Sequence, residues 1–198
     1  MQFFFPFFLI ICALFSMIVK RNTNAQGEQT KAFWEKERQA NLTRRKNIDN
    51  LDYITICWEA LPFLENPSEK IANCEKDMRS LEGQKILNLN GISNTDLKLT
   101  YGVANLPQLT EYDTNYLRLN SILAKWGQAL LDEGYTEEAR KVLELGVETG
   151  CDSSSIYLTL KSIYDSQGID GTDYLISKIS TSNSLMKNVI IEKLSGHK

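Results

Sequence analysis

The sequence predicts an all-α protein, in which an N-terminal transmembrane helix is followed by a small domain of antiparallel helical hairpins. Residues 3–19 form an apolar run without a single charged side chain. In the C-terminal half, apolar residues recur at spacings of three and four, which is the period of an amphipathic helix. Gly134, Gly150 and Gly168 separate these runs, and glycine is the residue that most often follows a helix.

The apolar run is predicted to be a signal-anchor helix, residues 1–19 in all. Its 17 residues would span about 26 Å as a helix, close to the ~30 Å hydrocarbon core of a bilayer. Lys20 and Arg21 follow the run directly, so the positive-inside rule places the C-terminal part in the cytoplasm. An exported protein with a cleaved signal peptide is the alternative, because Ala25 offers a small residue for cleavage. A lipoprotein signal at Cys12 is disfavoured by the large Ile11 before it.

Charge is distributed unevenly along the chain. Residues 20–46 carry eight Lys and Arg against three Glu, whereas residues 47–198, which we call the head, carry 14 basic and 22 acidic residues. An acidic surface repels phosphates, so the sequence predicts no binding of nucleic acid by the head.

Residues 20–50 are predicted to be a basic juxtamembrane neck that is partly helical. Its first part, residues 22–29, is polar and predicted to be flexible. Residues 31–46 contain good helix formers. Two interpretations remain open, a helix lying near anionic lipid and a solvated spacer helix.

Residues 51–110 are predicted to lead into the domain and to supply capping helices. Residues 53–56 are β-branched and aromatic, which favours a short extended segment packed on the helices. Asn66 is the predicted N-cap of a helix that ends at Gly83. A shorter helix is expected to begin at Asn94 or Thr95, and residues 105–110 are interpreted as a loop.

Residues 111–198 are predicted to form the helical hairpins. The expected N-caps are polar residues that precede apolar stripes. They are Asp113, Thr136, Ser153 or Ser154, Thr172, and Ser182 or Ser184.

The stretch from Asn120 to Ser153 resembles a tetratricopeptide repeat (TPR). Counted from Asn120, it matches the 34-residue signature at nearly every position, with Leu at the eleventh position and Cys151 at the end as departures. A second unit from Ser154 fits in part, with Lys161 and Asp173 where small residues are expected. The residues with predicted packing roles are Leu123, Trp126, Gly127, Gly134, Ala139, Leu143 and Gly146.

The resemblance implies a module that binds a protein or peptide partner in a groove. The implied groove positions are Ser121, Ala124, Gln128, Leu131, Asp132, Ser155 and Leu158, continuing to Ser162, Asp165 and Ser166. None of them is Lys, Arg or Asn, so capture of a C-terminal carboxylate is not expected. Small, polar and acidic groups suit a basic or neutral segment. The alternative is that neighbouring helices cover these positions.

The layout of the whole chain is similar to that of uncharacterised membrane-anchored proteins of Gram-positive bacteria. The segments that carry this similarity are Phe33–Arg38, Leu51–Ile56 and Gly91–Lys98. The similarity supports a membrane anchor, a neck and a head, and it implies no activity.

The sequence predicts neither an enzyme nor a cofactor or metal site. It lacks the common phosphate-binding, zinc-protease and serine-hydrolase motifs, and the sole histidine, His197, lies beside the C-terminus. Cys57, Cys74 and Cys151 are widely spaced, which indicates free thiols in a reducing compartment. The alternatives to a membrane-anchored adaptor or scaffold are an exported envelope protein and a subunit of a membrane enzyme complex, with a site formed by acidic residues or Cys57.

Overall fold

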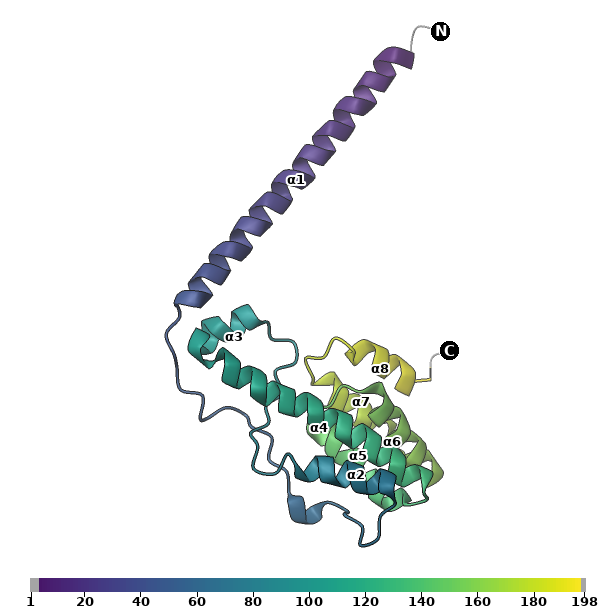
Figure 1. Cartoon of the computed structure of the whole chain (residues 1–198). Helices are drawn as coiled ribbons and strands as arrows, with labels where there is room; N and C mark the ends of the chain where they lie inside the picture. Colours follow the sequence, from purple (N-terminus) through teal and green to yellow (C-terminus); the bar gives the residue numbers. More distant parts are fainter. Residues whose placement is uncertain (1–3, 197–198) are drawn as a thin grey trace. The chain divides into compact units, whose positions relative to one another are not determined.

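The computed structural model describes residues 4–196, without the side chains of residues 4–14, 18, 19 and 21–26. Every regular element in this range is a helix, so the all-α prediction is confirmed (Figure 1). The predicted transmembrane segment falls mainly on side chains outside the described set, and His197 lies outside it as well. Among the described residues, no helix combines the length and apolar character needed to cross a bilayer.

The chain forms two compact units that interleave along the sequence. The first contains the residues up to Lys46 together with Ser93–Leu106, and the second contains Asn47–Ile92 and Pro107–Lys198. Residues 93–106 thus belong with the N-terminal helix, although they lie within the predicted segment 51–110.

The first unit consists of α1 (Phe4–Leu42), α3 (Asn94–Tyr101) and the 3-10 helix η2 (Val103–Asn105). Glu37 of α1 accepts hydrogen bonds from Lys98 and Thr95 of α3, and Lys36 pairs with Asp96 at 2.6 Å. The amide of Asn105 donates to the carbonyls of Lys46 and Tyr101, both at 2.7 Å.

Helix α1 differs from the prediction at both ends of the neck. Residues 22–29, predicted to be flexible, continue the helix, and the helix ends at Leu42 instead of Lys46. The segment contains no proline, and Glu28 and the glutamines Gln26 and Gln29 tolerate helical geometry well.

The second unit contains one long helix and several shorter ones. They are η1 (Trp58–Ala60), α2 (Glu69–Arg79), α4 (Leu106–Asp132), α5 (Thr136–Glu148), α6 (Ser154–Ser166), α7 (Thr172–Ser180) and α8 (Lys187–Leu194). The turn between α4 and α5 requires Gly134, whose φ of +87° is unfavourable for other residues. The extended segment at residues 53–56 is present, and the Ile54 N–H donates to the Ile86 carbonyl at 2.9 Å.

Trp126 lies at the centre of the core. It is fully buried, and its ring stacks on Phe63 with centroids 5.4 Å apart. The guanidinium of Arg79 covers the other side of the Phe63 ring at 3.8 Å from its centroid. Residues 61–64, which the sequence links to the entrance of the domain, therefore pack on the first helix of the predicted repeat.

Several predicted helix starts are wrong. Helix α4 begins at Leu106, so residues 105–110 are not a loop and Asp113 is not an N-cap. Pro107 lies in the first helical turn, where its missing N–H costs nothing. Ser68 caps α2 instead of Asn66, and its hydroxyl accepts the Ile71 N–H. In the same way, Ser93 caps α3 instead of Asn94 or Thr95.

The later caps also shift. Tyr135 precedes α5, so Thr136 is its first residue, and Gly171 precedes α7, so Thr172 is likewise internal. The last helix begins after Met186, because Ser182 and Ser184 use their hydroxyls within the preceding loop. Ser153 precedes α6 as predicted.

Candidate binding site

Of the seven residues with predicted packing roles, six are buried, whereas Gly134 is exposed in the turn between α4 and α5. Leu123, Ala139 and Leu143 are buried with Trp126. A Cβ at Gly127 would lie 2.5 Å from Leu143 Cδ2, and one at Gly146 would lie 2.9 Å from Ile156 Cδ1. Gly127 therefore brings α4 and α5 together, and Gly146 makes room for α6.

The predicted groove positions divide into two groups. Ala124, Leu131 and Leu158 pack partly against the core. Ser121, Gln128, Asp132 and Ser155 are exposed.

Within the exposed group, Asp132 is already engaged. It accepts hydrogen bonds from Lys70 of α2 and from Gln128, each at 2.7 Å, and these bonds hold the pKa of Asp132 below its usual value. Next to it, Glu133 accepts from the Ser68 hydroxyl at 2.6 Å. The predicted groove is therefore occupied in part by α2.

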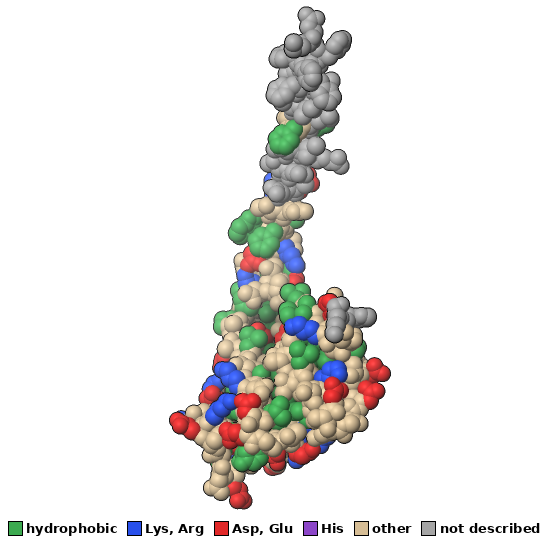
Figure 2. Space-filling view, turned by 90° about the vertical axis from the view of Figure 1, so that its right-hand side faces the viewer, with side chains coloured by type: hydrophobic (Ala, Val, Ile, Leu, Met, Phe, Trp, Pro, Cys, Tyr) green, Lys and Arg blue, Asp and Glu red, His purple; other side chains and the backbone are tan. Residues whose placement is uncertain are grey.

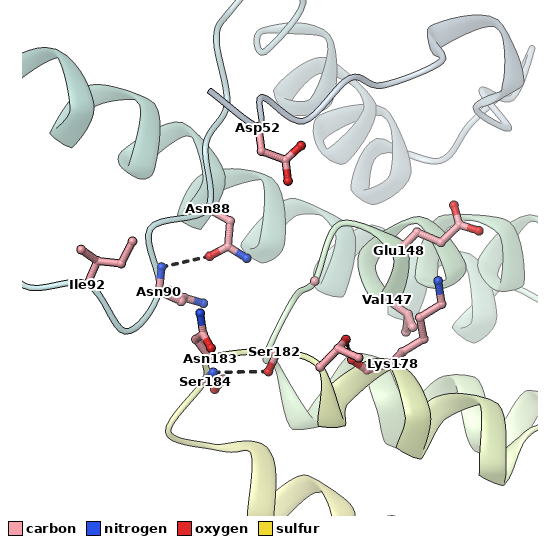
Figure 3. Close-up of a pocket in the computed structure, with 12 residues that line it drawn as sticks. Asp52, Asn88, Asn90, Ile92, Val147, Glu148, Lys178, Ser182, Asn183 and Ser184 are labelled. Atoms are coloured by element: carbon pink, nitrogen blue, oxygen red, sulfur yellow. Dashed lines mark hydrogen bonds between the residues drawn. The ribbon is translucent and has the colours of Figure 1, made fainter. Parts of the chain in front are cut away.

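A different concavity lies at the other end of the hairpin, and we call it the amide cleft. Its volume is about 350 Å³. Figure 3 shows the side chains of Asn88, Asn90 and Asn183 gathered on one side, with those of Val147, Glu148 and Lys178 on the other. Residues from four segments line it: Asp52, Asn88, Asn90, Ile92, Val147, Glu148, Gly150, Lys178, Thr181, Ser182, Asn183 and Ser184.

Hydrogen bonds to the core fix one wall of the amide cleft. The Asn88 amide donates to the Tyr116 hydroxyl at 2.9 Å, and that hydroxyl donates to the Gly150 carbonyl at 2.7 Å. Asn88 also accepts the Asn90 N–H at 3.0 Å. Burial raises the pKa of Tyr116 well above its usual value, so the hydroxyl stays a donor at every physiological pH.

Asp152 joins the two loops on the asparagine side of the cleft. One of its oxygens accepts from the Asn90 amide at 3.2 Å and from the Ser184 hydroxyl at 2.8 Å. Gly91 has a φ of +80°, and a Cβ there would lie 2.9 Å from the Asn183 carbonyl oxygen. The loop at residues 88–92 and the loop between α7 and α8 are therefore held together tightly.

Two carboxylates at the edge of the amide cleft have no partner among the described residues. Within the described chain, Asp52 and Glu148 form neither a hydrogen bond nor an ion pair through their side chains. Glu148 is the last residue of α5, where the helix dipole adds partial negative charge. Burial, together with the nearby charges of Glu148 and Glu144, raises the pKa of Tyr174.

The concavity continues along the extended segment. A second cavity of about 380 Å³ shares Asp52, Asn88, Glu148 and Gly150 with the first. It is lined further by Tyr53, Ile54, Thr55, Leu87, Leu145 and Thr149. The two cavities therefore adjoin at these four shared residues.

The described residues include neither a metal-binding cluster nor a thiol with a lowered pKa. Among them, no group of His, Cys, Asp and Glu could hold a metal ion. Cys151 is buried, which raises its thiol pKa to about 12, whereas Cys57 is exposed and lies 3.6 Å from Glu59. On the face in Figure 2, acidic and basic side chains are interspersed, so local groups decide what each surface binds.

The amide cleft was not predicted from the sequence. Its asparagines lie in loops at residues 88–90 and 183, nearly a hundred positions apart, and no periodic pattern connects them. The one available signal was the Asn90-Gly91 pair, which marks a turn.

Comparison of the chain with protein-family models, with curated proteins and with solved structures finds no match.

Proposed function

We propose that this protein is a non-enzymatic, membrane-anchored adaptor whose second unit binds an extended segment of a partner protein in the amide cleft. Residues 3–19 are the proposed anchor. The observation that carries the proposal is the cleft itself. Hydrogen bonds fix its amide groups, while the carboxylates of Asp52 and Glu148 have no partner in the described part of the chain.

Side-chain amides suit an extended peptide because each offers both a donor and an acceptor to main-chain groups. Asn183 makes no hydrogen bond through its side chain within the described chain, so both of its groups are available. The two carboxylates and the end of α5 favour a Lys or Arg on the partner segment. Lys178 limits the negative charge at the edge of the cleft. We therefore expect the partner segment to carry one basic residue, not a cluster of them.

The helical hairpin supports the proposal. Gly127 and Gly146 permit the close helix contacts on which TPR-like hairpins depend, and stacked helical hairpins commonly serve as binding scaffolds. The proposed site differs from the groove that the resemblance implies, because α2 engages Asp132 there.

The thiols support a cytoplasmic location for the second unit. Cys57, Cys74 and Cys151 are all free in the structure, as expected in a reducing compartment. The basic residues Lys20 and Arg21 directly after the apolar run favour the same orientation.

Selection from a random peptide library on the full chain in detergent micelles tests the proposal. We expect enrichment of peptides that contain one Lys or Arg. In the double variant Asp52→Asn/Glu148→Gln, we expect such a peptide to bind about tenfold more weakly, measured by fluorescence anisotropy, because the charge contact is lost.

The matched control is Asp77→Asn/Glu82→Gln, which removes the same charge from exposed positions of the second unit. It should leave the Kd unchanged. Equal weakening in both double variants would show that only net charge matters and would exclude the amide cleft as the site. Failure to enrich any peptide would contradict the proposed binding activity.

A further inference from the structure

Helix α8 and the residue pair before it expose apolar side chains to solvent. Leu185 is 95% exposed, Met186 44% and Val189 39%. The adjacent side of the helix is buried in the core through Ile190 and Leu194. Helix α8 is therefore fixed to the second unit by one face, while its exposed apolar side chains have no partner among the residues that the structure describes.

The exposed side chains form one stripe, which we call the α8 stripe. Met186, Val189 and Lys193 follow one another at spacings of three and four, so they share a side of the helix. Leu185 lies in the turn directly before the helix. Lys193 is exposed and makes no ion pair within the described chain. The stripe is thus apolar with a basic end.

The C-terminal segment that carries the α8 stripe is basic in sequence, unlike the rest of the head. Residues 178–198 contain four Lys and one Glu, whereas residues 47–177 contain ten basic and 21 acidic residues. Lys187 donates to the Ser180 carbonyl at 3.0 Å, so its ammonium group is held beside the start of α8. Apolar exposure and positive charge therefore coincide in one short segment.

We propose that the α8 stripe docks on an anionic lipid surface, with Leu185, Met186 and Val189 entering the headgroup region and lysines contacting acidic headgroups. Basic amphipathic surfaces bind membranes by this combination. The inference rests on the proposed membrane anchor, because an anchored chain meets the bilayer at a high effective concentration. A stripe of only a few side chains then suffices.

The observations favour lipid over a second copy of the chain. A two-fold contact would bring Lys187 and Lys193 of both copies into one small interface, which concentrates like charge. A stable protein interface also buries about 800 Å² on each side, far more than three side chains provide. An acidic protein partner is distinguished by the experiment below.

Hydroxyl-radical footprinting of the full chain, added to lipid vesicles, tests the inference. We expect oxidation of Leu185 and Met186 to slow at least about threefold with vesicles of phosphatidylcholine and phosphatidylglycerol, but not with phosphatidylcholine alone. High salt should reverse part of the protection. Exposed Leu117 of α4 serves as the internal control and should remain reactive in both. The variant Leu185→Ser should reduce protection of Met186, whereas Leu117→Ser should not.

Flotation of the same samples separates this inference from the proposed anchor. If the chain floats with both vesicle types and the α8 stripe is never protected, the docking inference is wrong while the anchor stands. If the chain floats only with anionic vesicles and α8 is protected, docking is supported and the anchor is contradicted. Flotation with neither contradicts both. Protection of Met186 in native membranes but not in protein-free anionic vesicles would assign the stripe to a protein partner and overturn the inference.

Discussion

Gly127 decides how closely α4 and α5 approach, because a Cβ at this position would lie 2.5 Å from Leu143 Cδ2. We expect Gly127→Ala to destabilise the second unit, since overpacking costs about 1–3 kcal/mol and exceeds the gain in helix propensity. In a Leu143→Ala background the same substitution should become stabilising by up to about 1 kcal/mol. Chemical denaturation of the four variants measures both effects.

The neighbouring substitution Gln128→Ala is the control, because Gln128 is exposed on the same helix. It should change stability by less than about 0.5 kcal/mol. If Gly127→Ala destabilises equally with and without Leu143, the close contact is not the cause.

Titration of Asp113 should make the stability of the second unit depend slightly on pH. Burial raises its pKa, although it accepts the Leu89 N–H at 3.3 Å. The folded state therefore holds the proton more tightly than the unfolded state, so stability is lost as pH rises from the ordinary value of 3.8 through the raised one. Asp113→Asn keeps the acceptor without the charge.

We expect Asp113→Asn to be more stable at neutral pH by less than about 1 kcal/mol, because the side chain is only half-buried. The difference should disappear below pH 3.8, where both side chains are neutral. Thermal unfolding across this range measures it, with Asp77→Asn as an exposed control. A stability difference between Asp113→Asn and the wild type that grows at acidic pH would contradict a raised pKa for Asp113.

At the scale of elements, Glu37 connects α1 to α3 through Lys98 and Thr95. Its hydrogen bonds with Lys98 and Thr95 lower its pKa, so its stabilising contribution is present above the ordinary value of 4.5 and is lost as pH falls through the lowered one. We expect Glu37→Gln to increase amide exchange of residues 94–101 several-fold at neutral pH, measured by hydrogen-exchange mass spectrometry.

Glu35→Gln supplies the matched control, since Glu35 pairs with Arg38 within the same helix at 2.6 Å and forms no hydrogen bond or ion pair with the described residues of α3. Exchange in α3 should be unchanged in this variant. Acidification should bring the amide exchange of α3 in the wild type closer to that in Glu37→Gln. If the difference in exchange between the two proteins stayed the same at low pH, the Glu37 carboxylate would be excluded as the link between α1 and α3.

The sequence predicts helices well where glycine and an apolar period act together, as at Gly134 between α4 and α5. It predicts helix starts poorly where several polar residues compete. Asn66 and Ser68 both suit a cap, and only the hydrogen bond from the Ile71 N–H to Ser68 decides between them. The start of α4 was missed because Pro107 reads as a loop residue although it also fits a first turn.

The candidate site shows more clearly which features local sequence patterns do not predict. The packing role of Gly127 follows from local spacing, because its contact partner Leu143 lies in the adjacent helix. The amide cleft depends on contacts between Asn90, Asp152 and Ser184, which are distant in sequence and individually ordinary. No local rule identifies such a set, because only the tertiary fold brings its members together.

At the scale of the whole molecule, the proposed orientation makes Cys57 a reporter of membrane topology. Cys57 is exposed in the second unit. We expect a membrane-impermeant thiol reagent to leave Cys57 unlabelled in intact cells and to label it after permeabilisation, because the bilayer separates the two. Mass spectrometry of the purified chain measures the labelled fraction.

Buried Cys151 should stay unlabelled until the protein is unfolded. Labelling of Cys57 in intact cells would instead establish the exported orientation.

The interleaving of the two units has a consequence for synthesis on the ribosome. Helix α1 emerges first, but its contacts Thr95, Asp96 and Lys98 emerge only after residues 47–92 have followed. Synthesis of the first unit therefore begins before that of the second. The first unit is complete while the second still lacks α4 and all later helices. A pause in translation near residue 92 would leave Glu37 without Lys98 and Thr95, and α2 without the helix on which it packs. During this interval the incompletely packed nascent chain is open to binding by a chaperone or by a membrane surface.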